Sequence, residues 1–143
     1  MANDNLVKLL YYSDPDPLAH DKLTSAELKT EIYEKLIKIV PRVGPKETAQ
    51  SILVVRVVNG RTDSVNNEFR NFLINIEVFV PLTQWIIKDS NLRPFAIMGE
   101  VQKSLKDKII DGFGKISGGD FIINFLTEEI SCYEMSFEVS SYD

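Results

Sequence analysis

Three residue types that often carry chemistry are almost missing from this sequence of 143 residues, which has one cysteine, one histidine and one tryptophan. Cys132 has no partner for an intrachain disulfide, so a reducing compartment fits best. His20 has no serine or cysteine motif around it, which argues against a nucleophilic triad with a histidine base. No apolar run approaches the roughly 20 residues that cross a bilayer. We therefore expect a soluble, intracellular protein without a membrane partner.

The charge of the chain is negative and unevenly distributed. A net charge of −5 argues against broad or sequence-specific binding of nucleic acid, which needs a dense surface of Lys and Arg. Residues 116–143 contain six acids and no base, whereas residues 88–115 contain six bases and four acids. Two interpretations stay open: both regions are solvated faces, or a basic helix of one copy meets an acidic strand of the next.

Hydrophobic periodicity predicts seven secondary-structure elements. Helices are expected over residues 5–12, 24–40 and 91–111, and strands over 51–58, 69–80, 121–126 and 132–140. The order helix, helix, strand, strand, helix, strand, strand is that of an α+β domain with helices packed on an antiparallel sheet. We expect one domain over residues 1–143, with an α+β core at 46–143 and a possible N-terminal helical arm at 1–45.

Local signals sharpen the expected boundaries. Thr24 and Glu27 have the spacing of a helix capping box. The polar stretch from Asn59 to Glu68 predicts a long loop rather than a tight turn. In the strand that follows, Leu73 and Phe79 interrupt the polar face, which predicts that this face is partly covered.

The third helix has the clearest pattern. Ser90 or Asn91 is expected to cap it, and Gly112 is expected to end it. Ile97, Val101, Leu105 and Ile109 recur at every fourth position and predict one apolar stripe. Gly99 costs a helix about 1 kcal/mol relative to Ala, so a close approach to another backbone would explain its presence.

No segment matches a known catalytic or ligand motif. The stretch from Asp14 to Asp21 lacks the Gly and Glu of a calcium loop, and Asp-Pro pairs are common in turns. The stretch from Asp111 to Asp120 has a helix before it and a strand after it, the reverse of a phosphate loop. We expect no enzyme, cofactor or metal site, although a metal-dependent nuclease assembled from distant acids and a lysine is the open alternative.

Residues from about 50 to 143 resemble the neck and tail-completion proteins of tailed bacteriophages, which include the tail terminators. Four segments carry the resemblance: FRNFLINIEVFVP, LTQWIIKDSNLRP, FAIMGEVQKSLKDKII with its FGK exit, and SCYEMSFEV. The resemblance implies a small α+β protein of the virion, assembled in the host cytoplasm. It implies a homo-oligomeric ring, commonly sixfold or twelvefold, that caps the tail tube or joins it to the head. Its partners would be copies of itself and neighbouring neck or tail-tube proteins.

The competing function is a small acidic adaptor or inhibitor module that binds one protein partner and stays monomeric. For a ring, the candidate interface residues are Trp85, Asn59, Arg61, Asp63, Lys103, Lys106, Glu134 and Glu138. Trp85 is explained either by packing beneath the first turn of its helix, the simpler interpretation, or by an interface. The loop over residues 59–68 either reaches a neighbouring subunit or is a hairpin tip.

Charge pairing between copies is a testable consequence of these positions. Reversing Glu134 and Glu138 to Lys should weaken assembly at low salt, because exposed pairs contribute about 0.2–1 kcal/mol each and set register. Adding Lys103→Glu and Lys106→Glu should partly restore it. Sedimentation velocity measures both effects, and an unchanged oligomer after the first reversal would disprove this contact.

Overall fold

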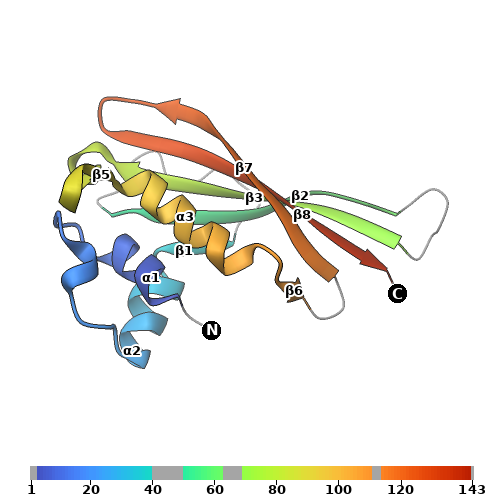
Figure 1. The fold of residues 1–143 in the computed structure, drawn as a ribbon, viewed down its shortest axis with the longest axis horizontal. Coiled ribbons are helices and arrows are strands. Elements are labelled where there is room, and N and C mark those ends of the chain that lie inside the picture. The colour runs from blue at the N-terminus through green and yellow to red at the C-terminus, as the bar shows by residue number, and fades with distance from the viewer. Residues whose placement is uncertain (1–2, 40–49, 63–68, 111–113, 143) are drawn as a thin grey trace.

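The protein is built around one six-stranded sheet with helices packed on it (Figure 1). The computed structural model describes residues 3–39, 50–62, 69–110 and 114–142. The strands, in spatial order, are β1 (Ile37–Ile39), β2 (Ile52–Thr62), β3 (Phe69–Pro81), β8 (Ile130–Tyr142), β7 (Gly114–Leu126) and β6 (Ile109–Ile110). The four long strands are antiparallel to one another, and β1 joins β2 in parallel. The expected α+β class is confirmed.

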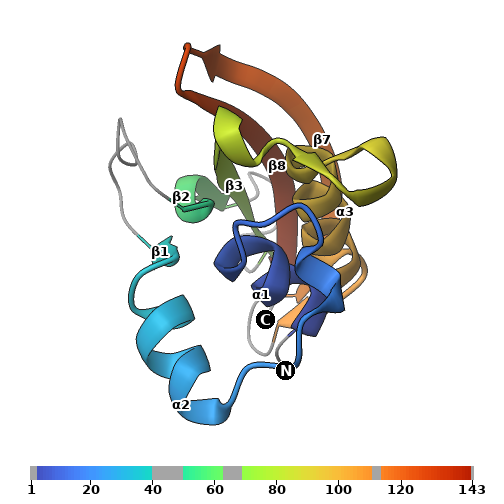
Figure 2. The same ribbon diagram turned by 90° about the vertical axis from the view of Figure 1, so that its left-hand side faces the viewer.

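Three helices accompany the sheet: α1 (Asp4–Tyr11), α2 (Ser25–Glu27, continued by a π-helical turn over Leu28–Tyr33) and α3 (Arg93–Leu105). The helix α3 runs along the sheet, and α1 packs against α3 (Figure 1, Figure 2). Asn3 caps α1, and its side-chain amide also donates to Ser104 Oγ of α3 at 2.9 Å. The capping box of Thr24 and Glu27 is confirmed. Among the described residues, no helix is long and apolar enough to span a membrane.

The core lies between α3, α1 and one face of the sheet. On that face, β3 contributes Ile76 and Val78, and β8 contributes Met135 and Phe137, all of them buried. The helix α3 places its own buried residues against this face, and these are Ile97, Met98 and Val101. The alternation in the sequence produces this arrangement because successive side chains of a strand point to opposite faces.

The opposite face of the sheet is also partly covered, as predicted, at Phe79 but not at Leu73, which is 39% exposed. Phe79 and its neighbour in β8, Cys132, are fully buried. A register shift between Ile123 and Phe125 changes the face to which the side chains at the end of β7 point. The Phe125 ring then lies 5.8 Å from the Phe79 ring, centre to centre.

Two expected strand boundaries in the sheet are wrong. The strand β2 continues to Thr62, so residues 59–62 belong to the strand and only the rest of the expected loop, 63–68, lies outside the described residues. The strand β7 begins at Gly114 instead of Phe121. Gly118 and Gly119, which indicated a turn, have φ of 100° and 108° at a second register shift inside β7.

The helix α3 also differs from the prediction at both ends. It begins after Leu92, with no side-chain cap from Ser90 or Asn91, and it ends at Leu105. Asp107 adopts a φ of 62°, which turns the chain away from the helix and into β6. Ile109 is consequently a strand residue and 75% exposed rather than part of the apolar stripe.

The explanation offered for Gly99 is wrong as well. A Cβ atom placed at Gly99 would meet nothing within 4 Å, so no close backbone approach requires glycine there. The second predicted helix is likewise shorter than the pattern indicated. Ile32 and Leu36 are buried as expected, but the chain then enters β1, where Ile39 is exposed.

A buried arginine, Arg93, connects the N-terminal segment to the start of α3. Its Nη1 atom donates to the carbonyl oxygens of Leu9 at 2.6 Å and Tyr12 at 2.7 Å, and its Nη2 atom donates to that of Asp14 at 2.7 Å. Its Nε atom donates to the carbonyl oxygen of Gln84 at 2.8 Å. Burial lowers the pKa of the guanidinium and the charge of Asp14 raises it, but arginine stays protonated in proteins.

Replacing Arg93 with Met should destabilise the fold by about 3 kcal/mol or more, because four carbonyl groups lose a donor in a buried setting. The matched control is Lys88→Met, which removes a cation from an exposed ion pair with Asp16 and should cost less than about 1 kcal/mol. Urea unfolding monitored by circular dichroism measures both changes. Equal costs for the two variants would show that the Arg93 contacts do not hold the fold together.

Candidate assembly surface

The connection between β3 and α3 contains the single tryptophan of the sequence, and the structure ties it to β8. Residues Leu82–Gln84 form a 3-10 turn, after which Trp85 Nε1 donates to Ser131 Oγ at 2.8 Å. The Ser131 hydroxyl in turn donates to the carbonyl oxygen of Val80 at 3.2 Å. Trp85 is half-buried against the core. Local packing therefore accounts for this residue, and its role in an interface stays a prediction.

An aromatic cluster extends from Trp85 across the first turn of α3 to β7. The Tyr133 ring lies 6.3 Å from Trp85, 5.4 Å from Phe95 and 6.2 Å from Phe121, between ring centres. Phe95 and Phe121 approach each other to 6.0 Å. Such separations are typical of stabilising aromatic pairs. The cluster fixes the hairpin of β7 and β8 against α3.

Beyond this cluster, the hairpin exposes an unusual amount of apolar surface. The exposed fractions are 41% for Phe95, 50% for Phe121, 65% for Ile122, 51% for Ile123 and 57% for Leu126. We call these five residues the hairpin surface. Ile122 pairs with Glu134 and Ile123 with Tyr133, so both faces of β7 contribute. Several exposed apolar side chains gathered on one hairpin are typical of a site that another molecule covers.

A polar cluster lies on the other face of the sheet, where Glu77 is fully buried. Arg56 of β2 donates to Glu77, and Asn75 donates to Glu134, the residue directly opposite Glu77 on β8. Ser136 Oγ completes the chain by donating to Asn75 Oδ1 at 3.2 Å. The two carboxylates are thus each held by a partner within the chain, and this cluster is a structural network.

Cys132 lies beside this polar cluster, and its environment keeps the thiol unreactive. Its sulfur lies 3.9 Å from Glu77 Oε2 and 3.9 Å from Asn124 Nδ2. Burial raises the pKa of the Cys132 thiol to about 11, with a further rise from Glu134, while Asn124 and Arg56 lower it. The thiolate is the reactive form, so the sulfur is protected at neutral pH.

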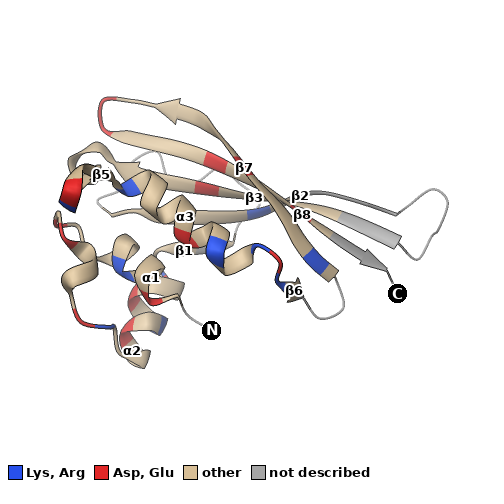
Figure 3. Cartoon of the chain, viewed as in Figure 1, with Lys and Arg blue, Asp and Glu red and all other residues tan. Residues whose placement is uncertain are grey.

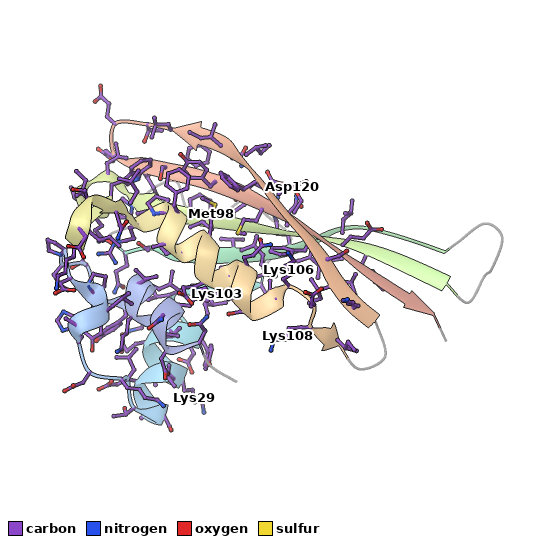
Figure 4. All side chains as sticks on the ribbon, viewed as in Figure 1. Lys29, Met98, Lys103, Lys106, Lys108 and Asp120 are labelled. Carbon is purple, nitrogen blue, oxygen red and sulfur yellow. The ribbon has the colours of Figure 1, made fainter. Side chains whose placement is uncertain are left out.

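The charged interface candidates lie on two different elements, with Lys103 and Lys106 on and just after α3 (Figure 4) and the two acids on β8. Lys103 forms an ion pair with Glu100 at 3.3 Å on α3, and Lys106 follows the end of that helix. Glu134 and Glu138 share the face opposite Tyr133, as expected from the alternation. Glu138 is exposed, whereas Glu134 is half-buried and engaged by Asn75. The structure does not bring the two sets together within one chain.

The loop candidates fall at the end of β2. Asn59 and Arg61 are paired with Leu73 and Asn71 of β3, so both are strand residues. Asp63 lies outside the described residues. The hairpin surface, by contrast, was not among the predicted sites. The nearly all-apolar stretch FIINFL was the sequence feature that could have pointed to this surface. A strand of that composition is usually buried, so it does not by itself predict an exposed site.

In the stretch from Asp14 to Asp21, side chains make contacts within the chain. His20 Nε2 lies 2.8 Å from Asp14 Oδ1, and the His20 ring stacks on Tyr12 at 3.9 Å. Within the described ranges, no group of three or more His, Cys, Asp or Glu residues has the geometry to hold a metal ion. The pairing instead fixes the turn that follows α1.

Fold and surface together define a small α+β protein with a six-stranded mixed sheet and an exposed apolar hairpin. The sequence model of the YomW family matches residues 3–139, so the chain belongs to the YomW family. This is a family of Bacillus phage-region proteins, which supports a phage-derived protein. No curated protein matches the sequence significantly.

The environment of Cys132 leads to a direct prediction. At pH 8, about one thiol in a thousand should be ionised, so a disulfide reagent such as Ellman's should label the native protein very slowly. Unfolding in guanidinium chloride should make labelling rapid. An Ile122→Cys variant provides a control, because its exposed cysteine on the neighbouring strand should react at once. Rapid labelling of Cys132 in the native wild-type protein would contradict the described burial.

Proposed function

We propose that this protein is a structural subunit of a phage particle that assembles into a ring at the head-to-tail neck or at the end of the tail tube. The single observation that carries the proposal is the hairpin surface, which exposes apolar side chains on both faces of one strand. Membership of a phage-region family supports the setting. The role is non-catalytic, and the protein assembles in the host cytoplasm before it joins the virion.

Ring formation requires a surface on each copy that fits a different surface on the next copy. The hairpin surface meets the first half of this requirement, because it is apolar at its centre and bordered by the acidic turn Glu128–Glu129 (Figure 3). Interfaces of this kind derive most of their affinity from a few buried aromatic residues. Phe121 and Phe95 are the aromatic residues of the hairpin surface. Neighbouring neck or tail-tube proteins would bind the remaining faces of the ring.

Negative-stain images and light scattering of the purified protein should show closed rings whose mass is a multiple of the 16.3 kDa chain. Phe121→Ser should raise the concentration for half-assembly by about tenfold or more, which corresponds to about 1.4 kcal/mol per interface. Tyr33→Ser is a matched control, since Tyr33 and Phe121 are both 50% exposed but Tyr33 lies beside α2. A protein that stays monomeric at every concentration would favour the acidic adaptor instead.

A further inference from the structure

Both sides of the sheet end in strands that are only partly paired. On one side, β6 pairs with Gly114 and Lys115, and Ile116 exchanges backbone hydrogen bonds with residues 107 and 108. On the other side, β1 pairs only with residues 53–55 of β2. Within the described ranges, residues 117–126 of β7 and 56–62 of β2 therefore have a neighbouring strand on one side only.

Open strand edges are normally blunted in proteins that remain monomeric, by Lys, Pro or a covering segment. The open stretch of β7 contains neither Lys nor Pro, and its last six residues are FIINFL. Ile122 and Ile123 are more than half exposed, one on each face. The backbone edge and both faces of the strand are thus available to a partner at once, which is the arrangement of a strand that receives another strand.

We infer that the open edge of β7 binds the open edge of β2 from a second copy, so that one sheet continues from subunit to subunit. This inference rests on the proposed self-assembly and names its contact.

Strand direction agrees with this pairing. The strands β2, β3, β8 and β7 alternate in direction, so β2 and β7 run antiparallel within one molecule. If a second copy joins with its strands oriented as in the first, its β2 lies antiparallel to the β7 of the first copy. The alternation of strand directions then continues from one copy to the next. The contact joins two different surfaces, so it repeats around a ring.

Charge and apolar contact also agree with it. The segment of residues 116–131 carries three acids, Asp120, Glu128 and Glu129, and no base. The open stretch of β2 carries no acid, and its bases are Arg61 and Arg56, of which Arg56 is already paired with Glu77 within the chain. Val57 in that stretch is 67% exposed and lies on the same face of its sheet as Ile123. Pairing two β7 edges instead would bring two acidic strands together, which is unfavourable.

The two short strands fix how neighbouring copies are offset. Arg56, Asn75, Ser136 and Asp120 lie at one level across the four long strands. From that level, the open stretch of β2 extends toward the end of the sheet where β7 begins. Most of the open stretch of β7 extends toward the opposite end, where β7 finishes. Matching the two stretches, with equivalent faces on the same side, requires a shift of roughly four residues, or about 14 Å. A constant stagger of this kind is what closes a sheet into a ring.

Cysteine cross-linking in the full chain tests this contact. In the double variant Val57→Cys/Ile123→Cys, mild oxidation should produce a ladder of covalent multimers on a non-reducing gel. Each single variant should stay monomeric on that gel, and a mixture of the two should stop at dimers. The double variant Val57→Cys/Phe121→Cys tests a pairing shifted by two residues along β7, because Phe121 lies on the same face as Ile123. Val57→Cys/Ile109→Cys is the matched control, because Ile109 is 75% exposed but lies on β6.

The outcomes separate this inference from the proposed function. Rings in negative stain without a ladder from either double variant would overturn the β7–β2 contact and leave the ring function standing. A covalent dimer from Ile123→Cys alone would show β7–β7 pairing and overturn the contact as well. A protein that forms no multimer under any condition would overturn the proposed function itself.

Discussion

The buried guanidinium of Arg93 is the interaction on which the rest of the structure depends. It collects carbonyl oxygens from the end of α1, from the turn that follows and from the connection before α3. Carbonyl groups at a helix end have no partner inside the helix, so a buried helix end needs a donor from elsewhere. Arg93 supplies that donor and so holds the N-terminal segment on the sheet.

The same residue positions the surface proposed for assembly. Its backbone N–H donates to the carbonyl oxygen of Trp85 at 2.7 Å, and Phe95 follows two residues later. Trp85 is bonded to Ser131 of β8, and Phe95 packs on Tyr133 and Phe121. The hairpin is therefore fixed in place by a chain of contacts that begins in the core. An assembly surface of this kind is preorganised, and less conformational freedom is lost on binding.

The polar network on the opposite face has a different effect. A buried ion pair such as Arg56–Glu77 adds little net stability, because the removal of both charges from water offsets their attraction. It does penalise a shifted register, since a slip by one residue would move Glu77 to the other face and leave Arg56 without its partner. In the long strand β2, part of whose edge is open, such a constraint on register matters more than the energy of the pair.

The sequence by itself determined the α+β class, the capping box at Thr24, and the alternating faces of β3 and β8. Each of these follows from periodicity or from a local motif, which residues close in the chain decide. Only the tertiary structure decided the length of β2 and β7, the early end of α3 at Leu105 and the role of Arg93. Strand ends and bulges depend on the neighbouring strand, and an arginine at the start of a helix gives no sign that it will be buried. The exposure of FIINFL was also decided by the tertiary structure. Its apolar character predicts burial, but its position near the edge of the sheet leaves four of its apolar side chains exposed.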